Sequence, residues 1–311
     1  MIKNKIEGIK PFNEFHYKSC YYHQYITGLS CFGVDKDNIL LNTFTFVKED
    51  FNVEERTFFQ EKTLEKKLGY KKIGCNINKK NLIKSIDRGQ PIIVGVECYY
   101  LESRVDTYMS QHLPHYILVY GYDLEKGEVD IVDHNYANSY EYMQKSISME
   151  NLLLASRMFK EENPKRRYAC CKLKKRGNFK DFSIWEKITN KNLLRSYQNS
   201  LKNLEELKRL FVSDIYEIEK KSDRLIEYLT KLKSLYFTIS QTKFFKETKQ
   251  REDTIGALTG AYSNVLSLFW KMKAQRNYEY GQRKQDRVLR KIEEIERLEE
   301  EIYKILTEVC G

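Results

Sequence analysis

The amino-acid sequence predicts a fold of the α+β class, with helices packed on an antiparallel sheet, followed by an all-helical domain. Apolar residues recur at helical spacing before residue 90, and several apolar segments separated by turn signals follow, which is typical of consecutive strands. After about Asp181, Gly and Pro nearly vanish, while Leu, Ile, Glu and Lys dominate. This change of composition indicates that the second half of the chain is helical.

The region before residue 90 is expected to contain helices. One is expected in SCYYHQYITGLSCFG, with its beginning near Ser19, and a second over residues 54–68. A third is expected from Asn78 to Arg88, because Asn is a favourable N-cap and an apolar face follows at helical spacing.

Strands are expected from residue 91 onward. The first covers PIIVGVECYYL, just after Gly89. The segments HYILVYGYD and EVDIVDH enclose the turn-forming residues LEKG, so we expect them to pair as a hairpin. The segment YACCKLKK is expected to form the final strand of the sheet.

We expect a catalytic α+β domain over residues 1–178 and a helical domain over residues 179–311. In the second domain, apolar residues recur every three or four positions from Leu194 to Ile218 and from Val288 to Val309. The uncharged segment GALTGAYSNVLSLFW lies between them and is expected to form a buried helix. These helices predict a bundle packed on the first domain, and a coiled-coil arm that forms a homodimer is the alternative.

Composition excludes several classes of protein. The longest uncharged stretch, Thr254 to Trp270, has seventeen residues, fewer than the roughly 18 to 20 apolar residues of a membrane span. The N-terminus offers no continuous apolar run of the kind that a signal peptide contains, so we expect a cytoplasmic protein without membrane contact. The seven Cys include no CxxC pair, which favours reduced thiols over a disulfide framework.

The charge balance favours an acidic partner. The chain has 54 Lys and Arg against 44 Asp and Glu, a net charge of +10. The sequence contains no P-loop, no dinucleotide-binding glycine pattern and no recognised nucleic-acid module. Nucleic acid is therefore not the expected partner.

Cys20 is the first candidate for chemistry, because the N-terminus of a helix near Ser19 would favour its thiolate. His115 opens the strand HYILVYGYD, and Asp133 lies near the end of the next strand. One hairpin would therefore bring an imidazole to the thiol and a carboxylate behind the imidazole. The order of Cys, then His on a strand, then Asp on the neighbouring strand is that of papain-type enzymes, whereas a buried structural Cys20 is the alternative.

The same segments resemble a known family. GQPIIVGVECYYL, HYILVYGYD and VDIVDHN resemble the N-terminal domain of the butirosin biosynthesis protein H family, itself similar to papain-like and bacteriocin-leader (C39) peptidases. The resemblance covers roughly residues 10–175, and its most specific parts are the apolar strand ending in Tyr-Tyr-Leu and the His-x5-Gly-Tyr-Asp segment. The segment GALTGAYSNVLSLFW is faintly similar to the helical extension of that family.

The resemblance implies a papain-like fold and cysteine-dependent transfer of an acyl group from a carrier-protein thioester to an amine in antibiotic biosynthesis. An enzyme that condenses an acyl thioester with a diamine, as in the closthioamide pathway, would be similar in kind. Carried over by position, Cys20 would be the nucleophile, His115 the general base and then acid, and Asp133 the group that orients the imidazole. His134 follows Asp133 where a Pro is common in the family, a departure that bears on which residue orients His115.

The resemblance also implies an oxyanion donor and partners. The donor would be a side-chain amide ahead of the nucleophile, for which Asn13 is the nearest, with Gln24 beyond Cys20. A turn or cap residue is the alternative for Asn13. The partners would be an acyl or peptidyl carrier protein and an amine or diamine substrate. No cofactor of the enzyme itself is expected, since phosphopantetheine would arrive on the carrier.

The segment NPKRRYACCKLKKR, which carries basic residues and no acidic one, is the expected contact for the carrier or its phosphate. The candidate carrier-binding residues are Lys165, Arg166, Arg167, Lys172, Lys174 and Lys175. A solvated edge strand protected by Lys is the alternative interpretation of this segment.

Other functions use the same residues. A cysteine peptidase or amidohydrolase of the C39 type would let water discharge the acyl enzyme, and a binding or scaffold protein would carry a vestigial triad. A zinc site was considered, with ligands among His16, Cys20 and His23 and the pair His112 and His115. Because the sequence contains neither CxxC nor HExxH, and Pro114 interrupts the histidine pair, we expect no metal.

Overall fold

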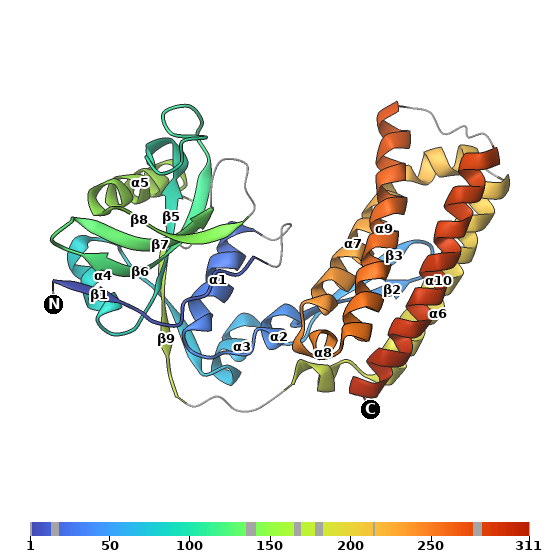
Figure 1. Cartoon of the computed structure of the whole chain (residues 1–311), viewed down its shortest axis with the longest axis horizontal. Coiled ribbons are helices and arrows are strands. Elements are labelled where there is room, and N and C mark those ends of the chain that lie inside the picture. The colour runs from blue at the N-terminus through green and yellow to red at the C-terminus, as the bar shows by residue number, and fades with distance from the viewer. Residues whose placement is uncertain are drawn as a thin grey trace. The chain divides into compact units, whose positions relative to one another are not determined.

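The computed structural model describes residues 2–13, 19–134, 141–164, 169–177, 183–213, 215–275 and 282–310. The chain contains two compact units (Figure 1). The first comprises Met1–Lys36 and Gln60–Phe182, and the second Asp37–Phe59 and Ser183–Gly311. The predicted α+β class with a helical C-terminal region is confirmed.

The first unit is built on a seven-stranded sheet with the order β4-β9-β5-β6-β7-β8, in which β1 also pairs with β6. All of these pairings are antiparallel. The strands are β1 (Lys3–Lys5), β4 (Tyr70–Gly74), β5 (Ile92–Glu97), β6 (Pro114–Asp123), β7 (Glu128–His134), β8 (Tyr142–Ser148) and β9 (Cys170–Lys175).

The predicted hairpin is confirmed as β6 and β7, which pair with Leu118 opposite Val132. The strand expected over residues 91–101 is shorter than predicted, because β5 ends at Glu97 and a 3₁₀ turn, η1 (Cys98–Tyr100), follows. The final strand, β9, pairs with both β4 and β5. The alternative interpretation of its basic segment as an exposed edge strand is therefore wrong.

Helices α1 (Cys20–Ser30), α3 (Glu61–Lys67), α4 (Lys79–Ile86) and α5 (Met149–Glu162) complete the first unit. The predicted starts of α1 and α4 are confirmed by their N-caps. Ser19 accepts a hydrogen bond from the N–H of Tyr22, and Asn78 accepts one of 2.8 Å from the N–H of Asn81. Each cap satisfies one backbone donor that the first turn leaves unpaired.

The prediction of a helix over residues 54–68 is wrong in its first part. Strand β3 (Asn52–Thr57) occupies that part and pairs with β2 (Thr43–Lys48) in a two-stranded sheet, so only α3 is helical. The turn between β2 and β3 holds Asp50 and Phe51 at positive φ. Phe51 is 2% exposed, and its ring packs edge-on against that of Tyr228. An aromatic residue rarely adopts this conformation, so tertiary packing rather than local preference fixes the hairpin.

The second unit is a helical bundle. Its long helices are α6 (Asn190–Ser213), α7 (Ile215–Ser240), α9 (Lys249–Gln275) and α10 (Gln282–Cys310), and its short ones are α2 (Asp37–Leu40), η2 (Ile184–Lys187) and α8 (Lys243–Lys246). Helix α7 packs on α9, α9 on α10 and α10 on α6, side by side as Figure 1 shows. The predicted bundle is therefore present within one chain, whereas homodimerisation through it stays a prediction. No helix of the described ranges combines the length and the apolar character needed to cross a membrane.

Side chains of α6 bind the β2–β3 hairpin to this bundle. Ser196 accepts a hydrogen bond of 2.8 Å from the N–H of Val47, and Asn199 donates one of 3.0 Å to its carbonyl oxygen. Asn203 donates a bond of 2.8 Å to the carbonyl of Lys48. These bonds pair backbone groups that would otherwise be buried unsatisfied. The single boundary expected between residues 178 and 179 therefore does not describe the second unit, which also takes Asp37–Phe59 from the N-terminal half; residues 178–182 lie outside the described residues.

Two glycines let helices approach the sheet closely. A Cβ atom at Gly28 of α1 would lie 2.6 Å from a methyl carbon of Leu173 and 3.0 Å from one of Leu118. A Cβ atom at Gly95 of β5 would lie 2.5 Å from a ring carbon of Phe159, in α5. Both contacts are shorter than carbon atoms tolerate, so neither position accepts a side chain without movement.

We expect Gly95→Ala to lower the free energy of unfolding by about 1–3 kcal/mol, because the buried ring of Phe159 leaves no room for a methyl group. Urea unfolding followed by circular dichroism measures the change. Gly74→Ala is the matched control, since nothing lies within 4 Å of its Cβ position, and it is expected to stay within about 0.5 kcal/mol of the wild type. Equal stability of the two variants would contradict this packing.

Candidate active site

Cys20 is the first residue of α1, which packs against β5 and β6. The preceding Ser19 has extended backbone geometry and caps the helix. The thiol is half-buried and lies within the positive end of the helix dipole. The predicted placement of Cys20 at a helix N-terminus is thus confirmed.

His115 and Asp133 meet across the β6–β7 hairpin. His115 is 4% exposed, and its Nε2 donates a hydrogen bond of 2.8 Å to Oδ1 of Asp133. The same imidazole lies close enough to Cys20 to lower the pKa of its thiol. The structure therefore brings together the three residues that the sequence proposed as a triad.

Asp133 is fully buried, and several groups surround its carboxylate. Its Oδ1 accepts a second hydrogen bond, of 2.7 Å, from the N–H of His134 and lies 3.8 Å from a guanidinium nitrogen of Arg104. Its Oδ2 lies 3.5 Å from Nζ of Lys145 in β8. Burial raises the pKa of Asp133, but the charges of His115, Lys145 and Arg104 outweigh it and hold the pKa well below the ordinary value.

The carboxylate determines the protonation of the other two groups. Burial lowers the pKa of His115, but the charge and hydrogen bond of Asp133 and the contact with Cys20 raise it to about 9. Burial raises the pKa of Cys20, but the hydrogen bond and charge of His115, with the backbone of Tyr116 and Tyr21, hold it below the ordinary value. Both shifts favour the thiolate–imidazolium pair over the neutral thiol and imidazole.

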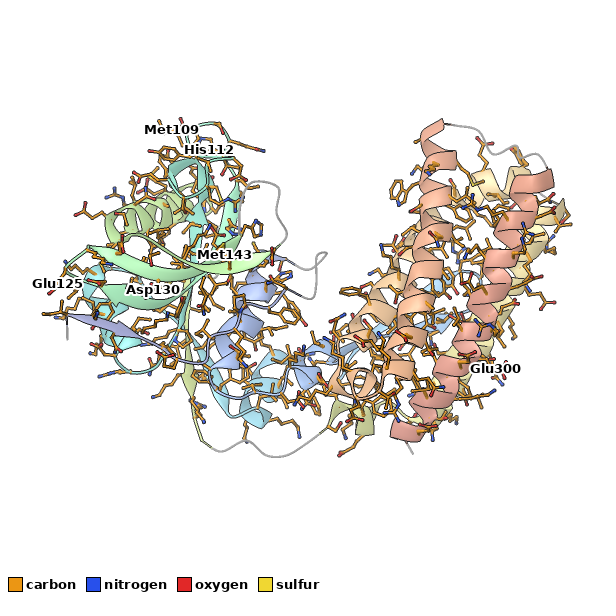
Figure 2. The ribbon with its side chains drawn as sticks, in the orientation of Figure 1. Met109, His112, Glu125, Asp130, Met143 and Glu300 are labelled. Carbon is orange, nitrogen blue, oxygen red and sulfur yellow. The ribbon has the colours of Figure 1, made fainter. Side chains whose placement is uncertain are left out.

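Arg104 and Lys145 are the residues that the sequence interpretation missed. Arg104 lies between β5 and β6, is 6% exposed, and donates two hydrogen bonds of 3.0 and 2.8 Å to the carboxylate of Asp106. Lys145 donates a bond of 2.6 Å to the carbonyl of His134. Met143, labelled in Figure 2, stands opposite Asp133 in the β7–β8 ladder and is 39% exposed. No local motif marks these positions, because the β7–β8 register brings Lys145 to Asp133 and the segment between β5 and β6 brings Arg104.

His134, which stands where a Pro is common in the family, does not replace Asp133 as the partner of His115. Burial and the charge of His115 lower the pKa of His134 to about 4, so its ring is neutral at physiological pH. The ring centroid lies 4.9 Å from that of His115 and 4.5 Å from that of Tyr142. The ring of His134 therefore lies beside the imidazolium of His115 without competing for its proton.

Two amides were candidates for the oxyanion donor. Nδ2 of Asn13 donates a hydrogen bond of 3.0 Å to the carbonyl of Tyr142, and Oδ1 of Asn13 accepts one of 2.6 Å from the N–H of Tyr142. These two bonds join the residues before α1 to β8. Gln24 lies one turn beyond Cys20 and is fully buried, and neither polar atom of its side chain has a hydrogen-bond partner in the described structure. The oxyanion role of Asn13 stays a prediction, and its contacts favour a bracing role.

The other candidates are only partly described. Lys165, Arg166 and Arg167 lie outside the described residues, as does His16. Lys174 and Lys175 are exposed on β9 and Lys172 is half-buried, so their contact with a carrier stays a prediction.

The described members of the proposed zinc set do not converge on one site. His23 is 3% exposed, its Nδ1 donates a bond of 3.0 Å to the carbonyl of Ser19, and its ring stacks on Tyr142. His112 lies with Glu97 and Glu162. These placements give the zinc alternative around Cys20 no support.

Comparison with known proteins adds one finding. Residues 52–134 match the family model of butirosin biosynthesis protein H, N-terminal. The resemblance inferred from the sequence is confirmed over these residues, which contain His115 and Asp133 but not Cys20. A search among curated proteins finds no match. The place of Cys20 in the site therefore rests on its contact with His115.

We expect Cys20 to be alkylated by iodoacetamide at neutral pH, because its thiolate persists until the pH falls through its lowered pKa. In His115→Ala the hydrogen bond and charge of His115 are lost, and burial outweighs the remaining backbone bonds of Tyr116 and Tyr21, so alkylation should appear only above the ordinary thiol pKa of about 8.5. Peptide mass spectrometry across a pH series measures both rates. Cys31 is the internal control, since burial raises its pKa to about 12, and superimposable profiles of wild type and His115→Ala would contradict the ion pair.

We expect the pKa of His115 to fall from about 9 in Asp133→Asn, because burial then outweighs the remaining contacts. Histidine-selective NMR titration measures the shift. Asp106→Asn is the matched control, since Asp106 binds Arg104 and not His115, and the pKa of His115 should stay near 9 there. An unchanged His115 titration in Asp133→Asn would show that another group holds the imidazolium.

Proposed function

We propose that the chain is a cysteine-dependent acyltransferase that forms an amide from a carrier-bound acyl thioester and an amine in antibiotic biosynthesis. The observation that carries the proposal is the contact of Cys20, at a helix N-terminus, with an imidazolium held by a buried carboxylate. The family match supports the biosynthetic context, because it takes its name from a butirosin biosynthesis protein and includes His115 and Asp133.

The first half-reaction transfers the acyl group to the enzyme. The thiolate of Cys20 attacks the thioester carbonyl, the carbon–sulfur bond to the carrier breaks, and His115 gives its proton to the departing thiolate of the carrier, which leaves as a thiol. The carbonyl oxygen gains charge during the attack. The backbone N–H groups at the start of α1 and the unpaired amide of Gln24 are donors available for that charge.

The second half-reaction releases the product. The now neutral His115 accepts a proton from the amine, the amine nitrogen bonds to the acyl carbon, and Cys20 departs as a thiolate to give an amide. Exchange of one thioester for another costs little free energy, whereas amide formation is downhill, so neither a nucleotide nor a redox cofactor is needed.

Charge and redox state supply further support. An acidic carrier protein fits the net charge of +10 and the exposed Lys174 and Lys175 of β9. The described cysteines are free thiols, as this chemistry requires of Cys20. We therefore place the reaction in the cytoplasm, where thiols are kept reduced.

Intact-protein mass spectrometry tests the proposal, with a panel of acyl-pantetheine thioesters in the presence and absence of a diamine. We expect a mass gain on the wild type that the diamine discharges faster than buffer does, and no gain on Cys20→Ala. His115→Ala should acylate slower by on the order of 100- to 10,000-fold. Cys31→Ala is the matched control, because this thiol lies just past the other end of α1, and it should behave as the wild type.

The other outcomes assign other functions. Discharge by water at the same rate with and without diamine would contradict acyl transfer and establish a hydrolase that uses the same triad. No adduct, together with a Cys20 that resists iodoacetamide at neutral pH, would contradict an enzyme and favour the binding-protein alternative.

A further inference from the structure

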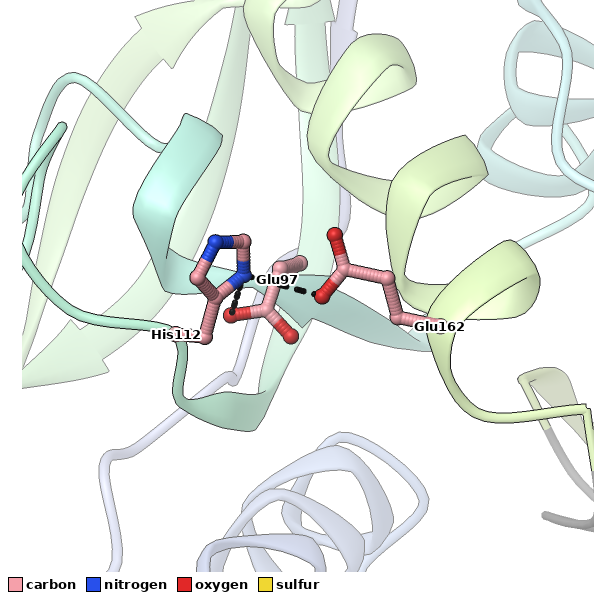
Figure 3. Close-up of side chains that lie close together, drawn as sticks. All are labelled: Glu97, His112 and Glu162. Atoms are coloured by element: carbon pink, nitrogen blue, oxygen red, sulfur yellow. Dashed lines mark hydrogen bonds and ion pairs between the residues drawn. The ribbon is translucent and has the colours of Figure 1, made fainter.

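Three side chains with metal-binding atoms converge at one end of β5, apart from the triad residues. Glu97 is the last residue of β5, His112 precedes β6, and Glu162 is the last residue of α5 (Figure 3). Nδ1 of His112 lies 2.9 Å from Oε2 of Glu162 and 3.9 Å from Oε1 of Glu97. The three ligand atoms all lie within 4.8 Å of one another.

The charges of this cluster do not balance. Glu97 is 1% exposed, and neither it nor Glu162 forms an ion pair with Lys or Arg in the described part of the chain. Two carboxylates face one imidazole, which contributes at most a single positive charge. A buried carboxylate without a compensating cation is costly. A divalent cation with a neutral imidazole would bring the net charge of the cluster to zero.

The ligand atoms are held in place by their surroundings. The ring of His112 stacks on Tyr99, with centroids 4.3 Å apart and planes 5° apart, so Nδ1 is aimed at the carboxylates. Oε1 of Glu97 accepts a hydrogen bond of 2.6 Å from the N–H of Leu113. Outer contacts of this kind orient metal ligands in proteins.

The separations fit a small transition metal. Ligand bonds of about 2.0 to 2.2 Å in a tetrahedral site place the ligand atoms about 3.3 to 3.6 Å apart. The observed 2.9 and 3.9 Å lie on either side of that range, and small rotations of the exposed Glu162 and His112 would equalise them. One imidazole nitrogen and two carboxylate oxygens suit Zn²⁺ better than Mg²⁺ or Ca²⁺, which prefer oxygen alone.

We propose that Glu97, His112 and Glu162 bind a Zn²⁺ ion. The ion would join the two ends of the segment between β5 and β6, because Glu97 precedes the segment and His112 lies at its end. The N–H of Cys98 already donates a hydrogen bond of 3.0 Å to the carbonyl of Leu113 at the same place. Glu162 would tie this closure to α5. The same segment carries Arg104 to Asp133, so the metal supports the loop that borders the triad. The proposal differs from the zinc alternative around Cys20, with which it shares only His112.

Titration of the EDTA-treated full chain with Co²⁺ and Zn²⁺ tests the proposal. We expect one Co²⁺ per chain, with weak visible absorption and no thiolate charge-transfer band, and its displacement by Zn²⁺. His112→Ala and Glu162→Gln change exposed ligands and are expected to weaken binding by at least about tenfold. Glu161→Gln is the matched control, since it removes an adjacent carboxylate of α5 that is outside the cluster.

Thermal unfolding provides a second readout. Zn²⁺ should raise the melting temperature of the wild type and of Glu161→Gln, but not that of His112→Ala. Equal affinity in wild type and both ligand variants, a thiolate band, or the absence of binding would overturn the proposal and leave the cluster as an ion-pair network. These readouts are independent of acyl transfer, so the metal site can fail while the proposed function stands, and the reverse.

Discussion

The buried carboxylate of Asp133 is the constraint on which the candidate site depends. A charge without solvent must be compensated by its neighbours, and here the compensation comes from three separate parts of the chain: His115 in β6, Lys145 in β8 and Arg104 in the segment after β5. These contacts fix the ends of three neighbouring strands and one loop relative to each other. The same negative charge keeps His115 protonated, and the protonated His115 in turn favours the thiolate of Cys20.

The thiol of Cys20 is placed beside His115 by helix packing rather than by charge compensation. Helix α1 approaches the sheet closely because Gly28 leaves room for Leu118 and Leu173, and the N-cap at Ser19 makes Cys20 the first residue of the helix. The imidazolium therefore meets a sulfur that already lies in the field of a helix N-terminus. The two sources of stabilisation act on the same atom, which offsets the burial that would otherwise raise its pKa.

Glu97 is a second buried carboxylate whose charge must be compensated, but its neighbours differ from those of Asp133. Asp133 has a lysine, an arginine and an imidazolium around it, whereas Glu97 has one histidine and the N–H of Leu113. The proposed metal supplies the missing charge. Glu97 and His112 flank the segment between β5 and β6, and Arg104 within it reaches Asp133, so the order of this segment is linked to the charge state of both sites.

Local signals predicted the parts of this protein that depend on neighbours in sequence. The caps Ser19 and Asn78 and the turn between β6 and β7 are such signals, and they placed Cys20, His115 and Asp133 correctly on their elements. The same kind of evidence failed at residues 54–57, where charged residues typical of a helix form β3, because packing of Phe51 and hydrogen bonds from α6 outweigh their preference.

The sequence by itself determined the α+β class, the helical second half and the three residues of the proposed triad. Only the tertiary structure decided that Asp37–Phe59 joins the helical unit, that β9 is an interior strand, and that Arg104, Lys145, Glu97 and Glu162 compensate or create buried charge. The physical reason is the range of the interactions. Caps and turns act over a few residues, whereas the compensation of a buried charge joins residues that are brought together only by strand register and helix packing.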